Sequence, residues 1–199
     1  MKVSLTRAAV TGCALMVLLL AAAQHIVVVL LPLMQRVLEH LLSDFHVVRF
    51  GFDREGVDPV LRVVVKVAHY AVVGDRLITP DGGGLANAST LSLQGFHGLF
   101  VALWVAMAWP APDPLATRLR RLMWLALPRA LLLLLDAPII LAASLWQIVL
   151  DALAPGSFSP LLLARDLLQG GGRLAAGAAL GAAAVSLTRR ASVDVSATD

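Results

Sequence analysis

Four apolar stretches alternate with more polar segments along this 199-residue chain. They cover residues 8–34, about 95–109, 122–150 and about 174–187. The third is 29 residues long and almost wholly apolar, which fits a membrane span better than the core helix of a soluble protein. We therefore predict four membrane-spanning helices.

The first apolar stretch also resembles two kinds of cleaved leader. Val10–Cys13 is similar to a lipoprotein cleavage box, but little apolar sequence precedes it. Ala21–Ala23 could end a signal peptide, yet the apolar stretch continues beyond it, whereas an ordinary signal peptide stops being apolar at its cleavage site. We favour an uncleaved first span within residues 1–36.

Residues 37–94 follow a different pattern, because apolar and polar positions alternate between Pro59 and His69. One side carries Leu61, Val63, Val65 and Val67, and the other carries Arg62, Val64 and Lys66. A period of two predicts a half-buried strand, and the turn around Gly56 pairs it with Phe45–Phe52. We predict a small antiparallel β-rich domain over residues 37–94.

Two shorter strands are expected at Val72–Thr79 and Ala88–Leu93, because a hairpin alone is only marginally stable in water. Val37–Leu42 is expected to extend the first helix as a short stalk. The predicted domain then contains more than one pair of strands, together with the end of the first helix.

Residues 95–190 are predicted to form a three-helix transmembrane region with a basic turn at 111–121. An interfacial helix at Pro160–Leu168 and a flexible break at Gly170–Gly172 are expected before the fourth span. That span begins either near Leu174 or near Leu167, the second alternative leaving Arg173 buried or snorkelling. Residues 191–199 are expected to form a polar tail.

Composition and charge agree with this fold class. The chain is 59% hydrophobic and 15% charged, against about 25% charged residues in soluble domains. Seven basic residues fall on one side of a four-span arrangement, which predicts that this side is cytoplasmic: Lys2, Arg7, Arg118, Arg120, Arg121, Arg189 and Arg190. We predict an α+β membrane protein with both termini cytoplasmic and an extracytoplasmic β-rich domain between spans one and two.

Asp136 is the main candidate for intramembrane chemistry, because a carboxylate within a span is costly. Arg129 lies seven residues earlier on the same predicted helix, too far for direct contact, and Gln24 and His25 on the first span are candidate partners. Two interpretations stay open: a polar site or proton path through the membrane, and a packing pair that fixes how the first and third spans meet.

Other residues suggest packing more than chemistry. Gly177 and Gly181 form a G-x-x-x-G motif that lets a helix approach closely, either from this chain or from a partner. The histidines have no metal-ligand spacing, and Cys13 is the only cysteine. We therefore expect no catalytic residues, no metal site and no cofactor. No basic block interleaved with aromatic residues indicates nucleic-acid binding.

The order of elements and the segment Gly98–Pro110 resemble the small accessory membrane proteins encoded with exosortases, in particular the exosortase H-associated membrane protein. Exosortases are bacterial membrane enzymes that process the sorting tails of exported proteins. The resemblance implies the bacterial cytoplasmic (inner) membrane and an exosortase-like partner enzyme. An exosortase itself is expected to carry an outer-face cysteine, whereas Cys13 lies near the inner end of the first span.

Two main functions follow as hypotheses. The first is a non-enzymatic accessory or scaffold protein that acts through helix packing and its β-rich domain, in contact with the lipid bilayer and a membrane-protein partner. The second is a small transporter, or a transporter subunit, that uses Asp136. A third, an intramembrane hydrolase, would have to use Ser144 and His25, the only candidates for nucleophile and base.

Overall fold

The computed structural model describes residues 5–73, 76–80, 84–109 and 114–196, so Lys2 and part of the 111–121 turn lie outside the described residues. The chain divides into two compact units. Unit 1 comprises residues 1–24, 95–133 and 171–199, and unit 2 comprises residues 25–94 and 134–170. The two longest helices each contribute to both units.

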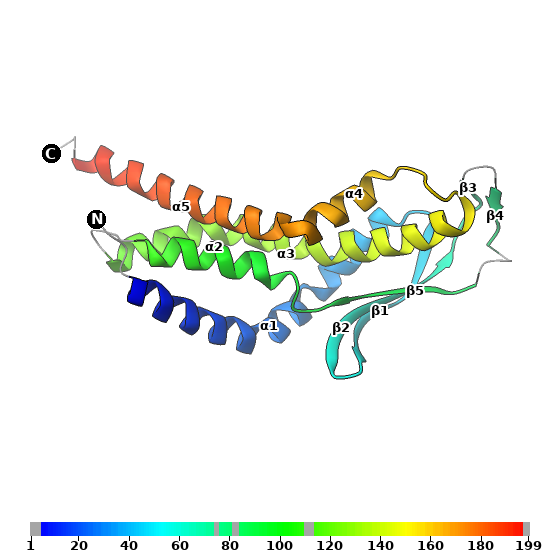
Figure 1. Cartoon of the computed structure of the whole chain (residues 1–199), viewed down its shortest axis with the longest axis horizontal. Helices are drawn as coiled ribbons and strands as arrows, with labels where there is room; N and C mark the ends of the chain where they lie inside the picture. Colours follow the sequence, from blue (N-terminus) through cyan, green and yellow to red (C-terminus); the bar gives the residue numbers. More distant parts are fainter. Residues whose placement is uncertain (1–4, 74–75, 81–83, 110–113, 197–199) are drawn as a thin grey trace. The chain divides into compact units, whose positions relative to one another are not determined.

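Along the chain, a run of strands separates the long first helix from the later helices (Figure 1). In chain order the elements are α1 (Leu5–Leu41), β1 (Phe45–Glu55), β2 (Asp58–Val67), β3 (Ala71–Val73), β4 (Arg76–Ile78), β5 (Ala86–Leu91), α2 (Phe96–Ala108), α3 (Pro114–Leu153), α4 (Pro160–Leu167), the π-turn η1 (Leu168–Gly172) and α5 (Arg173–Ser196). The predicted combination of helices with a small antiparallel sheet between the first and second helices is confirmed.

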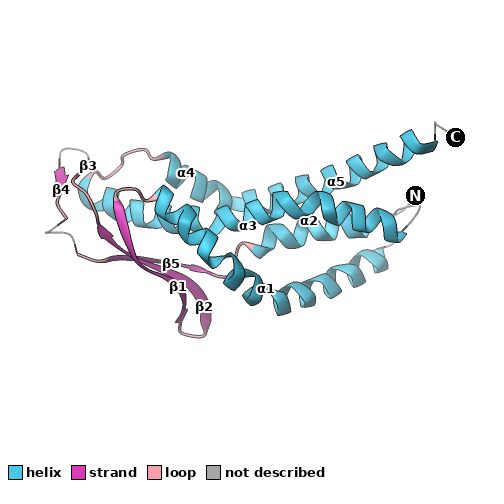
Figure 2. Ribbon diagram, turned by 180° about the vertical axis from the view of Figure 1, so that it is seen from behind, coloured by secondary structure: helices cyan, strands magenta, loops and turns pink. Residues whose placement is uncertain are grey.

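Among its described residues, unit 1 contains helices and no strand. It contains the first part of α1, all of α2, the first part of α3, and α5. α2 and α5 lie side by side, as both ribbon views show (Figure 2). A small core forms where Leu125 of α3 meets Ala106 of α2 and Ala184 of α5.

Unit 2 is built on an antiparallel sheet with the strand order β1-β2-β5. Leu61, Val63 and Val65 of β2 are almost completely buried, whereas Arg62 and Val64 are half-buried and Lys66 is exposed. The predicted alternation is therefore confirmed from Leu61 to Lys66, whereas Val67, predicted on the buried side, is only half-buried. The ring of Phe45, where β1 begins, meets Trp146 of α3 edge-on with ring centroids 6.3 Å apart.

Val72–Thr79 does not form one strand as predicted. It is divided between β3 and β4, which pair with each other, Val73 opposite Arg76, in a separate two-stranded sheet. The sequence contains the signal for this hairpin, because Gly-Asp at 74–75 is a dipeptide typical of two-residue turns. These two residues themselves lie outside the described part of the chain.

The later helices follow the expected order with different limits. α4 matches the predicted Pro160–Leu168 helix within one residue, and the glycine break contains Gly171 at φ 109°, a left-handed conformation that glycine adopts easily. α5 continues to Ser196, so residues 191–196 extend the helix. Neither glycine nor proline occurs after Gly181 to end it.

Two helices among the described residues are long and apolar enough to cross a membrane, Gly12–Leu41 and Ala116–Leu153. α2 is also apolar but only 13 residues long. Length and composition give weak support for a membrane protein, because the core helix of a soluble protein can have the same composition. The side chains that each helix buries carry more information.

Candidate functional site

The first part of α3 is amphipathic in the reverse sense to a helix in a soluble protein. Its exposed side carries large apolar side chains at every fourth position: Leu119, Met123, Leu127 and Leu131. Its buried side carries Arg121, Leu125 and Arg129. Met123 is 77% exposed while Arg121 is 1% exposed. Ionisable residues that face the interior of a bundle, with apolar residues outside, are typical of membrane helices.

Arg121 joins three helices of unit 1 from this buried position. Its Nη1 donates to the carbonyl oxygens of Ala106 and Trp109, at 2.7 and 2.8 Å, and its Nε donates to Thr188 Oγ1 at 3.3 Å. The first two acceptors lie at the C-terminal end of α2, where carbonyls have no partner within the helix and a cation also offsets the helix dipole. Arg121 thus caps α2.

Arg120 adds a second link between α3 and α5. Its Nη2 donates to the backbone oxygen of Thr188 at 2.8 Å. The sequence indicated only that the arginines of this turn bias the topology. Their structural role could have been suspected from spacing, because Arg121 stands four residues before Leu125 and eight before Arg129, on one helix face.

Gly177 and Gly181 lie where α5 touches α2 of the same chain. A Cβ atom at Gly181 would come within 2.8 Å of the Ala102 oxygen, and one at Gly177 would clash with the backbone of Gly98. Gly98 in turn leaves no room for a Cβ beside the Arg173 carbonyl, 2.6 Å away. Of the two alternatives for this motif, the structure therefore shows packing within the chain, with Gly98 as a third member that the sequence did not reveal.

Arg129 is the most unusual polar residue of unit 1. It is 7% exposed, and its Nε and Nη2 atoms have no hydrogen-bond partner among the described residues. Burying an unpaired cation is costly, so this position is a candidate for function or for a contact beyond this chain.

Asp136 is also buried, at 4% exposure, but it belongs to unit 2 whereas Arg129 belongs to unit 1. Gln24 and His25, the expected partners of Asp136, are both exposed on α1 at the point where the chain passes between the units. These two side chains do not share the burial of Asp136. Ser144 is half-buried on α3, so the nucleophile and base considered for a hydrolase have different environments.

A charged cluster on the sheet of unit 2 was not anticipated. Arg62 on β2 forms ion pairs with Asp53 and Glu55 on β1, at 2.9 and 2.7 Å. Ser89 on β5 donates to Glu55 Oε1 at 2.7 Å. The Ser89 hydrogen bond, followed by that from Arg62, lowers the pKa of Glu55, and the bond to Glu55 raises the pKa of Arg62. The cluster links all three strands.

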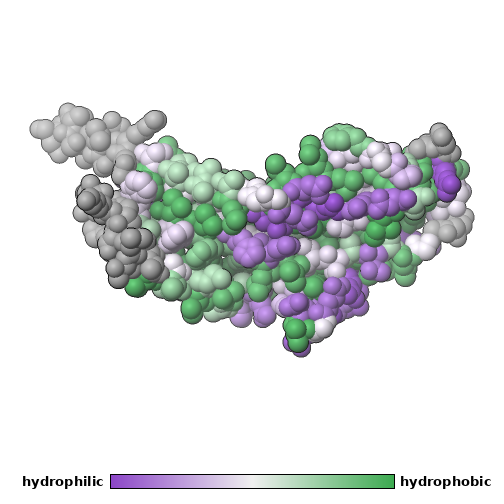
Figure 3. All heavy atoms as spheres, in the orientation of Figure 1, coloured by the Kyte–Doolittle hydropathy of each residue, from purple (hydrophilic) through white to green (hydrophobic). Residues whose placement is uncertain are grey.

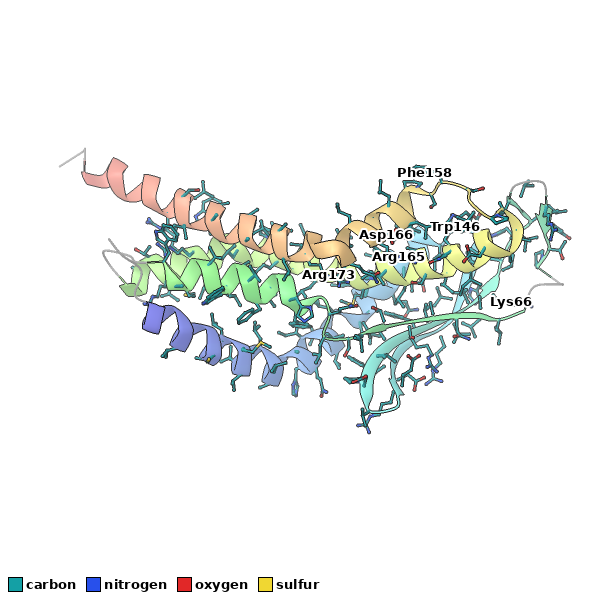
Figure 4. All side chains as sticks on the ribbon, viewed as in Figure 1. Lys66, Trp146, Phe158, Arg165, Asp166 and Arg173 are labelled. Carbon is teal, nitrogen blue, oxygen red and sulfur yellow. The ribbon has the colours of Figure 1, made fainter. Side chains whose placement is uncertain are left out.

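Arg165 forms a second polar link within unit 2. From the last turn of α4 it donates to Gln147 Oε1 on α3 and forms an ion pair with Asp166 at 2.9 Å (Figure 4). Within the described residues, no group of three histidine, cysteine, aspartate or glutamate side chains could hold a metal ion. The contact from Arg165 to Gln147 connects α4 to α3, whereas its ion pair with Asp166 lies within α4.

The surface of unit 1 also has an apolar hollow of about 770 Å³ along α1. Its lining contains one thiol and otherwise aliphatic side chains: Cys13, Ala14, Val17, Leu18, Ala21 and Ala22. Hydrophobic side chains continue over the visible face of the unit 1 helices (Figure 3). Apart from the Cys13 thiol, such a surface offers no acid, base or hydrogen-bond donor to a polar substrate, and it suits an apolar environment.

The comparisons with known proteins give no match. Neither a protein-family model, nor a curated protein, nor a solved structure is similar to this chain.

Proposed function

We propose that this chain is a non-enzymatic accessory protein of the bacterial cytoplasmic (inner) membrane. Four helices would anchor it, both termini would be cytoplasmic, and unit 2 would lie on the outer side. The observation that carries the membrane part of this proposal is the reversed pattern of α3, with Arg121 and Arg129 buried and Met123 and Leu127 exposed. In water such a helix would expose its leucines at the cost of the hydrophobic effect.

The polar contacts of the described residues support action through contact. Arg120 and Arg121 hold helix ends, and Arg62 and Arg165 connect strands and helices. These side chains are engaged in structural contacts and are not grouped as nucleophile, base and orienting residue. A protein of this kind can present a folded outer unit to a partner. We propose that the partner is an exosortase-like enzyme of a protein-sorting system.

The proposed topology is supported by charge. Arg118, Arg120 and Arg121 stand before the apolar part of α3, and Arg189 and Arg190 follow the apolar part of α5. Basic residues near the ends of spans are retained in the cytoplasm. The sheet unit between α1 and α2 is then exported, where it can meet other extracytoplasmic proteins.

Site-specific photocrosslinking in native membranes tests the accessory function. A photoreactive residue at Val57, 95% exposed in the turn between β1 and β2, should give a discrete product containing a second membrane protein. The same residue at the buried Leu61 serves as the control and should give none. The photoreactive residue is also placed at Met123, which is exposed on α3. If Val57 and Met123 both give products that contain only lipid or a second copy of this chain, these products would argue against a partner enzyme.

The alternative function, a small transporter or transporter subunit, is favoured by the burial of Asp136. Under this alternative Asp136→Asn should abolish ion or substrate flux into liposomes while the protein still inserts and folds. Under the accessory function the same variant alters no flux. The control is Asp151→Asn, which changes an exposed aspartate on the same helix. Comparing the flux through the two variants separates the two functions.

A further inference from the structure

The antiparallel sheet of unit 2 ends in a strand edge on each side. In the order β1-β2-β5, β2 has a strand on both sides, whereas β1 and β5 each pair on one side only among the described residues. The three strands lie side by side in Figure 2. The free side of an edge strand presents backbone N–H and C=O groups with which a further strand can pair.

β1 carries features that prevent such pairing. A register shift between Val47 and Arg49 interrupts its ladder with β2, as a β-bulge does. Charged side chains also follow along the strand: Arg49, Asp53, Arg54 and Glu55. Bulges and charges are the usual protection of an edge against the addition of another strand. The β1 edge is therefore unfavourable for a partner strand.

β5 has none of this protection. From Gly84 to Gln94 the chain contains neither a charged residue nor a proline. The ladder with β2 runs from Ala86 to Leu91 without a register shift. Asn87 and Leu91 are exposed. Natural sheets protect edges that have no partner, so an unprotected edge indicates a surface that pairs with another segment.

The pairing pattern identifies the backbone groups on the free side of β5. The Ser92 amide donates to the Pro59 carbonyl at 3.1 Å, in register with the antiparallel ladder. Hydrogen-bonded residues alternate along such a ladder, so every second residue back from Ser92 points its backbone groups toward β2. The residues between them point theirs to the free side: Asn87, Ser89 and Leu91. Of these groups, the Leu91 carbonyl already accepts from the Gln94 amide at 3.2 Å.

The solvent-facing side of the sheet beside this edge has an excess of negative charge. The cluster on it holds two carboxylates, Asp53 and Glu55, against the single guanidinium of Arg62. Glu55 reaches β5 itself, since Ser89 donates to its Oε1 at 2.7 Å. A strand added beside β5 would place one side chain about 5 Å from Ser89. A lysine or arginine at that position would complement the charge of the cluster.

We propose that the free edge of β5 binds an extended segment of a partner protein by strand addition, with a basic side chain of that segment beside Ser89. Main-chain hydrogen bonds along the edge supply the affinity, and the carboxylates of the cluster select the basic residue. β5 is 6 residues long, so it matches a segment of roughly 20 Å. The inference rests on the proposed accessory function and specifies the contact through which unit 2 meets its partner.

Peptide binding to the purified full chain in detergent tests this inference. The probe is a short fluorescent peptide of alternating threonine and valine with a central lysine, so that lysine and threonines share one face of the extended peptide. The control peptide has glutamate in place of the lysine. We expect the lysine peptide to bind about fivefold more tightly than the glutamate peptide, on the scale of an exposed ion pair.

Three variants of one exposed residue separate backbone from side-chain effects. Asn87→Pro removes a free-side N–H and leaves the ladder with β2 in place, so it should weaken binding about tenfold. Asn87→Ala is the matched control, because it keeps the amide and should bind within about twofold of wild type. Asn87→Lys also keeps the amide but adds a positive charge, and it should weaken binding of the lysine peptide and not of the glutamate peptide.

Hydrogen exchange of single amides distinguishes strand addition from other binding. In the free chain, the amides of Asn87, Ser89 and Leu91 should exchange quickly and those of Ala88 and Thr90 slowly. The lysine peptide should slow the first group alone. Protection of Ala88 and Thr90 in each variant shows in addition that the sheet is intact.

No binding of the lysine peptide, or binding that leaves the exchange of the free-side amides unchanged, would overturn the inference. Protection of these amides without peptide would overturn it as well: at constant level it would mean that another segment of the chain covers the edge, and rising with protein concentration it would mean that two copies pair. Equal affinity for both peptides would overturn the choice of a basic partner. The crosslinks at Val57 test the accessory function separately, because they do not depend on the β5 edge.

Discussion

At the scale of single residues, neighbouring positions on β2 have opposite environments. Val65 is fully buried against the interior of unit 2, and Lys66 is exposed. Val65→Asp should therefore destabilise the protein by about 3 kcal/mol, because it buries a charge without a partner. Denaturant unfolding followed by limited proteolysis of the sheet measures the effect. Lys66→Asp is the control, and equal protease sensitivity of the two variants would contradict the alternation.

The Glu55 cluster predicts a dependence of stability on pH. Because the folded state lowers the pKa of Glu55, its carboxylate stabilises the fold above the unfolded-state value, near 4.5, and this contribution is lost as pH falls through the lower folded-state pKa. The stability difference between wild type and Glu55→Gln should thus be greatest near neutral pH and vanish in acid. Unfolding measured from pH 7 to pH 3 checks this.

Ser89→Ala gives that measurement a matched control. The Ser89 hydroxyl is the main cause of the lowered pKa, ahead of Arg62. Its removal should move the acid loss of stability to higher pH while the Arg62 ion pairs with Asp53 and Glu55 persist. An unchanged pH profile in this variant would mean that the cluster does not couple the three strands as described.

At the scale of secondary-structure elements, the contact between α2 and α5 depends on three glycines. Gly177→Ala or Gly181→Ala would push a methyl group into the backbone of Gly98 or Ala102. Overpacking of this kind destabilises by about 1–3 kcal/mol. Thermal unfolding in detergent measures it, and Gly170→Ala, where an added Cβ meets open space, should be close to neutral. Equal stability of Gly177→Ala and Gly170→Ala would show that the helices are not in close contact.

Hydrogen bonds from Arg121 stabilise the C-terminal end of α2. Arg121→Lys keeps the charge but loses the planar fork that reaches Ala106, Trp109 and Thr188 together. We expect a loss of about 2 kcal/mol, the scale of a hydrogen bond from a charged group. Arg118→Lys is the matched control, because the buried Nε of Arg118 has no hydrogen-bond partner among the described residues. A larger loss in the control would contradict the capping role.

At the scale of the whole molecule, the proposal predicts which segments are accessible from outside an intact cell. In a Cys13→Ser background, a membrane-impermeant thiol reagent should modify Val57→Cys between β1 and β2 and spare Thr117→Cys at the start of α3. Opening the membrane should make Thr117→Cys reactive. Labelling of Thr117→Cys in intact cells, with protection of Val57→Cys, would reverse the topology.

Sequence by itself determined the elements whose signal is local. The alternation through Leu61, Val63 and Val65 defines a strand because side chains of a strand point to opposite faces in turn. The extension of α1 to Leu41 and the α4 helix at Pro160 were likewise predictable from apolar periodicity and a helix-starting proline. The β3–β4 hairpin has a local signal as well, in the dipeptide Gly74-Asp75.

Tertiary structure decided everything that depends on residues far apart in the chain. Arg120 meets Thr188 across 68 positions, and Gly177 meets Gly98 across a helix pair, and neither partner has a pattern that identifies the other. Hydropathy likewise showed that α3 is apolar but not that Arg129 faces inward and Leu127 outward. The physical reason is that periodicity records the environment of a residue relative to its own helix or strand, whereas packing and burial depend on which other element covers it.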